Sequence, residues 1–212
     1  ADPAIVADLA PTGSLRAAIN LGNSVMCQGT ADEPSGLTVD LARELACRLG
    51  VPARLHGTRA ARDSFAALMG GAVDIAFLAH EPARAAEVAF IPPYAAIEAA
   101  YVVPAAGRLA TAAEVDRPGV RVGVKAGSAY DLFLTRTLRQ AEVVRGAEGV
   151  DVFRDQGLEV GAGIRGPVME FAARHPGLRV LDEAFMQIRQ SIASRRDRMP
   201  QTLAWLAQTM AE

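Results

Sequence analysis

The 212-residue sequence has little lysine and few aromatic residues, and each shortage excludes a class of function. Lys125 is the single lysine, and 22 Lys and Arg against 24 Asp and Glu leave a net charge of −2. That balance argues against nucleic acid as a partner, because phosphate binding needs a concentrated basic face. Aromatic residues make up 5% of the chain, too few for a base-stacking platform. No apolar run approaches the roughly 18 residues that a membrane-spanning helix needs.

Cysteine and histidine are also scarce. Cys27 and Cys47 make neither a disulfide framework nor a metal site, which leaves open a single bridge in an oxidising compartment. The histidines, His56, His80 and His175, lie far apart and never at the spacing of metal ligands. We therefore expect a globular protein without a metal ion or other cofactor.

Strand-like and helix-like stretches alternate along the chain, which predicts an α/β protein with a largely parallel sheet. The clearest helix carries Leu41, Leu45 and Leu49 on one face, and Gly50 follows it as a stop signal. Strands are expected at residues 14–20, 51–55, 73–78, 101–104, 120–124 and 179–181, with an exposed one at 186–192. Helices are expected at residues 38–49, 64–69 and 127–138, around residues 203–206, and as a short helix that starts at residue 111. A strand followed by a helix is expected over residues 158–174.

Two motifs of possible chemical meaning need to be weighed. Residues 161–166 match G-x-G-x-x-G, but the preceding strand is interrupted by Glu159. Since Pro167 fits the first turn of a helix, we interpret these glycines as a tight strand-to-helix turn. Ser128 lies in no G-x-S-x-G elbow and has no histidine partner by any local pattern. It follows a strand and opens a helix, where it either caps that helix or helps to bind a carboxylate or phosphate.

Three separated segments share the patterns of one protein family. Residues 36–50 are similar to its G-f-x-v-D-L-A segment. Residues 65–94 are similar to L-x-x-G-x-x-D-I followed by T-P-E-R-x-x-x-x-x-F-S-x-P-Y, and residues 120–128 to V-G-V-x-x-G-S. By these segments the chain resembles the family 3 extracellular solute-binding proteins, the periplasmic receptors of polar amino-acid ABC transporters.

The resemblance implies an α/β, two-lobe, periplasmic-binding-protein-like fold of type II, with the ligand cleft between the lobes. Carried onto this chain, lobe one is 1–102 plus 188–212 and lobe two is 105–184. The hinge crossovers then lie near 101–104 and 183–190.

The resemblance also implies ligand-binding residues. Arg84 matches the family's arginine that grips the ligand carboxylate, as a bidentate guanidinium does well. Ser128, with the amides near Gly127 and Ala129, matches a second anion contact from the other lobe.

The chain departs from the family at other expected contacts. Leu78 and Ala79 stand where hydroxyl residues are usual, and they offer only backbone groups. Asn23 lies in the loop that usually carries an aromatic residue of the cleft. Glu98 and Arg165 complete the set of expected ligand contacts.

These observations predict a function and two alternatives. We expect the periplasmic substrate-binding component of an ABC importer for a small carboxylate-bearing solute, amino-acid-like or an organic acid. It would be a monomer without catalytic activity, with its signal peptide already removed, and its partner would be the membrane-embedded ABC permease. The alternatives are a sensory ligand-binding module on the same fold, and a dehydratase-like enzyme derived from it with Glu98 as proton donor.

One family position bears on the ligand. In amino-acid-binding members, an aspartate in a D-A-x-x-x-D stretch of the second lobe receives the α-ammonium group, and Ile164 stands at that place here. Arg165 beside it would suit a second carboxylate, a phosphonate or a hydroxy acid. We therefore expect a ligand other than a conventional α-amino acid, unless Glu98 or Asp131 supplies the missing acid.

Overall fold

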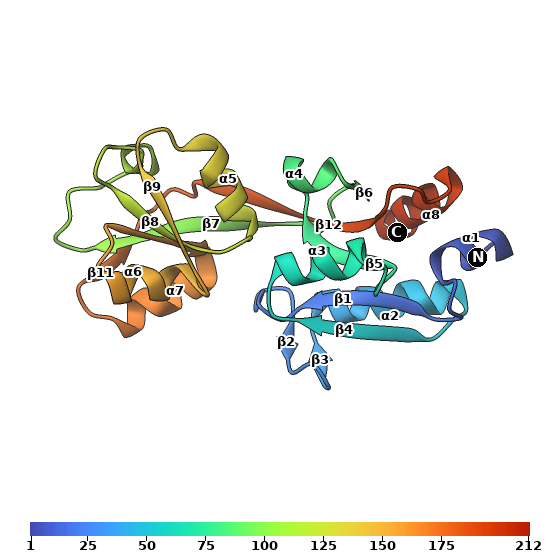
Figure 1. Ribbon diagram of the computed structural model, residues 1–212. Helices are drawn as coiled ribbons and strands as arrows, with labels where there is room; N and C mark the ends of the chain where they lie inside the picture. The colour runs from blue at the N-terminus through green and yellow to red at the C-terminus, as the bar shows by residue number, and fades with distance from the viewer. The chain divides into compact units, whose positions relative to one another are not determined.

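The computed structural model describes residues 1–212, which divide into two compact units (Figure 1). Unit 1 comprises Ala1–Ala95 and Arg189–Glu212, and unit 2 comprises Ala96–Ile188. Both boundaries fall inside long strands, β7 (Ala95–Pro104) and β12 (Met186–Arg195). Unit 1 is thus built from two separate stretches of chain, whereas unit 2 is continuous.

Unit 1 contains a sheet in the order β4-β1-β5-β12. Its central strand β1 (Leu15–Asn20) runs parallel to β4 (Ala53–Thr58) and β5 (Ile75–Ala79), and β12 runs antiparallel to β5. The short β6 (Val88–Phe90) also pairs with β12. A separate hairpin joins β2 (Gln28–Gly29) to β3 (Pro34–Ser35).

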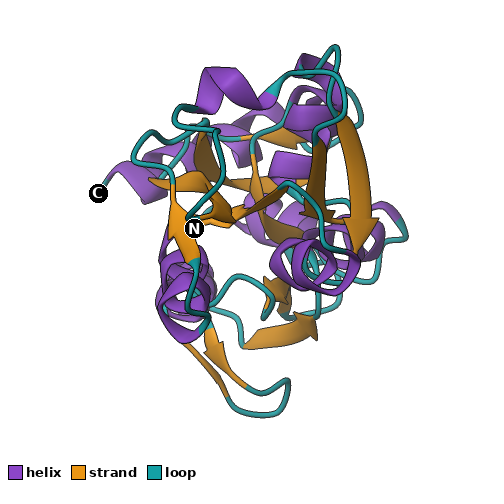
Figure 2. Ribbon diagram, turned by 90° about the vertical axis from the view of Figure 1, so that its left-hand side faces the viewer, coloured by secondary structure: helices purple, strands orange, loops and turns teal.

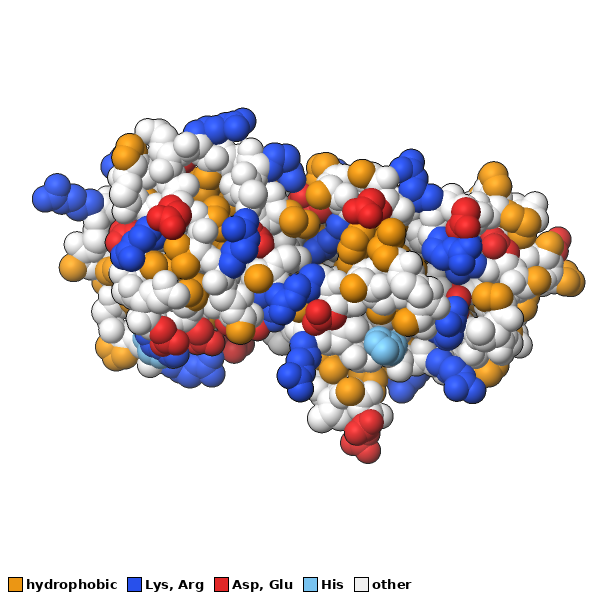
Figure 3. Space-filling view, viewed as in Figure 1, with side chains coloured by type: hydrophobic (Ala, Val, Ile, Leu, Met, Phe, Trp, Pro, Cys, Tyr) orange, Lys and Arg blue, Asp and Glu red, His pale blue; other side chains and the backbone are white.

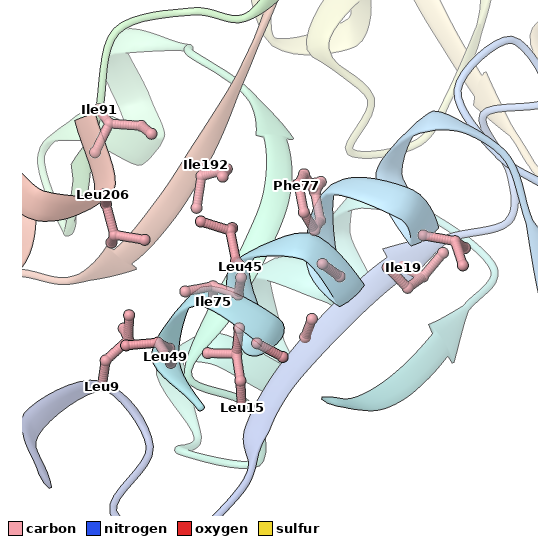
Figure 4. Close-up of a cluster of buried hydrophobic side chains, with 14 of the residues drawn as sticks. Leu9, Leu15, Ile19, Leu45, Leu49, Ile75, Phe77, Ile91, Ile192 and Leu206 are labelled. Carbon is pink, nitrogen blue, oxygen red and sulfur yellow. The ribbon is translucent and has the colours of Figure 1, made fainter. Parts of the chain in front are cut away.

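Helices cover both faces of this sheet because both faces of its strands are apolar. On one face, Ile19 belongs to a core that includes Leu45 and Leu49 of α2, whose side chains point toward Leu15 and Ile75 (Figure 4). Neighbouring Ala18 packs in a second cluster, on the α3 side. The helices of unit 1 are α1 (Pro3–Leu9), α2 (Leu37–Leu49), α3 (Ala61–Met69), α4 (Pro82–Ala85) and α8 (Pro200–Ala211).

A buried ion cluster joins the strand starts of unit 1. Asp74, 1% exposed, accepts hydrogen bonds from the backbone N–H of Arg16 (2.9 Å) and from its guanidinium (2.7 and 3.0 Å). Arg198, which precedes α8, lies 3.6 Å from the same carboxylate and also binds Asp8 near the end of α1. The cluster therefore ties both terminal helices to the sheet, at the edge opposite to the ends of β1 and β5.

Within unit 2 the strands lie in the order β7-β10-β8-β9. Strand β8 (Arg121–Lys125) runs parallel to β9 (Glu142–Gly146) and β10 (Val160–Ile164), while β7 pairs antiparallel with β10 and β11 (Leu178–Val180). Its helices are the 3-10 helix η1 (Ala112–Val115), α5 (Ala129–Thr137), α6 (Gly149–Gln156) and α7 (Arg165–Arg174). Figure 2 shows the helices in purple alongside the strands in orange.

Several expected elements are corrected by the structure. Helix α3 begins at Ala61 rather than at residue 64. The sequence pattern placed its start too late because the first turn carries the exposed, charged Arg62 and Asp63 instead of apolar residues. Strand β12, expected to be exposed, is buried over most of its length. Its residues 190–194 pair with β5 and its residues 193–195 pair with β6, so neighbouring strands cover it. No element was expected at 139–157, where β9 and α6 lie. Cys27 is buried, Cys47 is exposed and both are free thiols. None of the helices combines the length and apolar character needed to cross a bilayer.

Candidate functional site

The candidate residues of unit 1 gather at one edge of its sheet. Strands β1 and β5 are parallel neighbours, so the loops that follow them leave the sheet at the same edge. Asn23 lies in the loop after β1, and Arg84 lies in α4, shortly after β5. We call Asn23, Ala79, Glu81 and Arg84 the unit 1 half-site.

Arg84 is held in place by the end of its own strand. Its side chain is buried, with 4% of the residue exposed, and its Nη1 atom donates to the Ala79 carbonyl at 3.3 Å. Burial lowers the pKa of Arg84 to about 10, against the opposing effect of the nearby Glu81 carboxylate. The guanidinium is therefore still charged at neutral pH, as a carboxylate-binding group must be.

Glu81 is the residue of this half-site that the sequence analysis overlooked. Only 2% of it is exposed, and it precedes α4 without capping that helix through its side chain. A signal was present in the sequence, because in the family's T-P-E-R pattern Glu81 stands at the place of the threonine. A neutral residue has thus been replaced by an acid three positions before the arginine.

The remaining expected contacts of unit 1 are Leu78, Ala79 and Asn23. Leu78 packs in the apolar cluster beneath α3, so its side chain belongs to the core. The Ala79 carbonyl is already an acceptor for Arg84. Asn23 is 7% exposed, and its Oδ1 atom is buried without a hydrogen-bond partner. A buried acceptor of this kind favours a hydrogen-bond donor nearby, since leaving it unpaired costs about 1–3 kcal/mol.

In unit 2, Gly127, Ser128 and Ala129 form the turn between β8 and α5, as expected. Gly127 has φ of 72°, a conformation that favours glycine, and Ser128 is the N-cap of α5. The Ser128 Oγ atom accepts from the backbone N–H of Asp131 at 3.1 Å, so the capping role of Ser128 is present in the structure. Ala129 is the first residue of the helix and is buried.

The acid that completes this turn is Asp131. It is 3% exposed and accepts hydrogen bonds from the Gly127 N–H (2.8 Å) and the Thr135 hydroxyl (3.1 Å). The Arg145 guanidinium, from β9, lies 3.0 Å from the same carboxylate. The helix start therefore already carries an internal anion with its own cation.

Glu98 and Arg165 lie against each other in unit 2. Glu98 lies in β7, and Arg165 begins α7 directly after β10, the antiparallel neighbour of β7. Arg165 Nε donates to Glu98 Oε2 at 2.6 Å. Arg165 also donates to the Asp182 carbonyl at 2.9 Å, and Gln187 donates to Glu98 at 3.1 Å. These hydrogen bonds, the one from Arg165 first, hold the pKa of Glu98 below its usual value. Glu98 is thus the ion-pair partner of Arg165 in the structure.

The G-x-G-x-x-G motif has a packing explanation instead of the turn we expected. Gly161 and Gly163 lie inside β10 rather than in a loop. A Cβ atom on Gly161 would come within 2.8 Å of Val102, and one on Gly163 within 2.8 Å of Val168. These glycines let neighbouring side chains approach the strand closely, and they form no phosphate-binding loop.

No group of three or more His, Cys, Asp or Glu side chains is placed to hold a metal ion. Positive and negative side chains are interspersed over the face shown in Figure 3. Chemically, the unit 1 half-site and the turn of residues 127–129 with Asp131 in unit 2 each offer buried polar groups, with hydrogen-bond donors and acceptors. Such groups suit recognition of a small polar solute.

Comparison with protein families gives one match. The profile of the bacterial extracellular solute-binding proteins, family 3, matches residues 22–212. The match includes all three segments on which the sequence-based resemblance depends, so that resemblance is confirmed. None of the curated proteins compared with this chain matches it.

Solved structures share the fold. An arginine-bound point mutant of ArgBP from T. maritima is 19% identical, with a TM-score of 0.78 over 97% of this chain and 98% of that one. A putative binding component of an ABC transporter from Wolinella succinogenes, complexed with lysine, is 20% identical, with a TM-score of 0.77 over 94% and 89%. AncCDT-1, an ancestral amino acid-binding protein and precursor of cyclohexadienyl dehydratase, is 21% identical, with a TM-score of 0.75 over 97% and 92%. At these identities the likeness shows the fold alone, which confirms the predicted α/β, type II periplasmic-binding-protein-like class.

Proposed function

Because the chain belongs to family 3 of the bacterial extracellular solute-binding proteins, we propose that it is the substrate-binding component of an ABC importer. In this proposal it binds a small carboxylate-bearing solute in the periplasm and delivers it, as a monomer, to the membrane-embedded permease. It carries out no chemical reaction on that solute.

The observation that carries this proposal is the buried arginine of unit 1. Arg84 occupies the place of the family's carboxylate-binding arginine, and it is buried and positively charged at the edge where β1 and β5 end. A guanidinium in that position presents several N–H donors to a planar anion and can bind a carboxylate through two of them. Burying so polar a group is costly, and a ligand-binding role accounts for that cost.

We further propose that the ligand contacts a half-site from each unit. Unit 2 would contribute the turn of Gly127, Ser128 and Ala129, at the end of a strand as in unit 1. The lobes proposed from the sequence, 1–102 plus 188–212 and 105–184, would then be the two ligand-binding halves. Glu98 and Arg165, paired with each other, would line unit 2 as one neutral group.

Of the alternatives, the dehydratase-like enzyme is disfavoured by the charge of Glu98. A general acid works best with a pKa raised toward neutrality, whereas Arg165 and Gln187 lower the pKa of Glu98. Nothing observed in either unit favours a sensory module over a transport receptor.

Native mass spectrometry of the protein as purified, followed by a thermal-shift screen of the ligand-stripped protein, tests the proposal. We expect a small carboxylate that leaves on denaturation, or one that raises the melting temperature when it is added to refolded protein. Aromatic and aliphatic alcohols without a carboxylate serve as matched controls. A protein that neither retains nor binds any carboxylate would contradict the proposed function.

A further inference from the structure

The Asp131 carboxylate has its acceptor positions filled from within unit 2. Its Oδ2 atom accepts from the Gly127 N–H at 2.8 Å and from Arg145 Nε at 3.1 Å. Its Oδ1 atom accepts from the Thr135 hydroxyl at 3.1 Å and lies 3.0 Å from Arg145 Nη2. A carboxylate has about four lone-pair sites, so these contacts leave none for a ligand ammonium group. Asp131 therefore acts inside unit 2 rather than as an acid that binds the ligand.

Arg145 supplies the positive charge for Asp131 from a neighbouring strand. It lies in β9, which runs parallel to β8, and its guanidinium reaches the first turn of α5, which follows β8. Its Nη2 atom also donates to the Thr135 hydroxyl at 2.6 Å. Lys125, the last residue of β8, is instead paired with Glu148. The side chain of Asp131 is 5% exposed and that of Arg145 is 46% exposed, so a buried anion is paired with a cation that solvent reaches.

This ion pair lies at the turn that unit 2 would contribute to ligand binding. The Gly127 N–H donates to the Asp131 carboxylate. The N–H groups of Ala129 and Tyr130 lie in the first turn of α5, where a helix has no carbonyl of its own for them, and donors of this kind attract an anion. A buried carboxylate in the same turn would repel that anion if its charge were not balanced, and Arg145 provides the balance.

We propose that Arg145 is a positioning residue of the ligand site, which neutralises Asp131 so that Asp131 can fix the turn of residues 127–129 without repelling a ligand carboxylate. Asp131 fixes this turn through the N–H of Gly127, whose φ of 72° favours glycine. Arg145 acts through Asp131 and needs no contact with the ligand. The inference rests on the proposed function, because it concerns the turn that unit 2 contributes to the same site.

A double-variant experiment separates charge balance from simple support of the turn. Ligand-stripped protein is screened by thermal shift against the standard amino acids and the unbranched mono- and dicarboxylic acids of two to six carbon atoms. The carboxylate that most raises the melting temperature is the probe. By calorimetry, Arg145→Gln should bind this probe about five- to ten-fold more weakly than wild type, because the charge of Asp131 is then unbalanced.

Arg145→Gln combined with Asp131→Asn should return to within about three-fold of wild type, because the amide carries no charge and can still accept from the Gly127 N–H. Simple support predicts the opposite order, since the double variant has no fewer hydrogen bonds to lose than Arg145→Gln and should bind no better. Arg121→Gln is the matched control. Arg121 forms an ion pair with Glu159 at the start of β8 rather than near its end, so its substitution should leave binding unchanged.

Melting curves by circular dichroism check that each variant folds. If Arg145→Gln does not fold, Asp131→Asn alone carries the test, because it should bind the probe at least as tightly as wild type, and weaker binding would overturn the inference. Wild-type affinity in Arg145→Gln, or a double variant as weak as Arg145→Gln, would also overturn it and leave the proposed function standing. A wild-type protein that binds no carboxylate of the panel would overturn both.

Discussion

Arg84 and Ser128 differ in what their removal leaves behind, although both lie at proposed ligand contacts. Arg84→Ala should weaken binding of a carboxylate ligand by about 2–5 kcal/mol, because a desolvated anion loses its cation. Ser128→Ala should weaken binding by only about 1 kcal/mol, since backbone donors remain at the start of α5. The Ser128 Oγ atom already accepts from the backbone N–H of Asp131. Titration calorimetry with the recovered ligand measures both losses. Arg43→Ala, on an exposed part of α2, is the control.

Equal and negligible losses for the Arg84 and Ser128 variants would remove both residues from the ligand site. Melting curves must accompany the calorimetry, because Arg84→Ala also removes a buried cation that acts on the buried Glu81. A variant that keeps its melting temperature and loses the ligand separates the two effects.

The sequence identifies some residues of the candidate site and not others, for a physical reason. Arg84 is predictable because a local pattern surrounds it, and Ser128 because it lies between a strand and a helix. Asp131 looks like an ordinary acid in the first turn of a helix, where such residues are common. Its partner Arg145 comes from the following strand, and only folding brings the two together.

At the scale of elements, Gly149 lets α6 approach the strands of unit 2 closely. A Cβ atom added to Gly149, the first residue of α6, would lie 2.8 Å from the Gly123 carbonyl of β8 and against the Ala162 carbonyl of β10. Gly149→Ala should therefore push α6 away from the sheet and lower the free energy of unfolding by about 2–3 kcal/mol. Urea denaturation measures this change.

Gly70→Ala gives the comparison for that experiment. Gly70 ends α3 with φ of −78°, and the nearest atom to an added Cβ is the Ala66 carbonyl at 3.2 Å. Its substitution should change the unfolding free energy by no more than about 1 kcal/mol. Similar effects at Gly70 and Gly149 would show that the contact of α6 with the sheet has room to relax.

The elements that the sequence predicts are those whose apolar face is wide. Helix α2 was expected at 38–49 and spans Leu37–Leu49, with Gly50 in the left-handed conformation of a helix stop. The pair β9 and α6 was missed because charged residues interrupt its short apolar pattern. Strand β9 is an edge strand with no fully buried residue, and α6 buries mainly Val152 and Phe153. Such elements are stabilised by the rest of unit 2 rather than by local sequence.

For the whole molecule, the proposal that a ligand contacts half-sites of both units makes a prediction about size. Small-angle X-ray scattering should show a smaller radius of gyration when the recovered ligand saturates the protein, because one ligand then bridges both units. Arg84→Ala at the same ligand concentration should keep the ligand-free value. An unchanged radius in the saturated wild-type protein would argue that only one unit holds the ligand.

The discontinuity of unit 1 has a consequence for the order in which the chain folds during synthesis. Strand β5 completes its hydrogen bonding only with residues 190–194 of β12, and the core beneath α2 needs Ile192 and Leu206. Unit 2, residues 96–188, is by contrast a continuous stretch that is synthesised before β12 is complete. A chain made from its N-terminus can thus finish unit 2 first. Until its last stretch is made, unit 1 keeps an unpaired strand edge and an uncovered apolar face, the features that invite aggregation in a half-made chain.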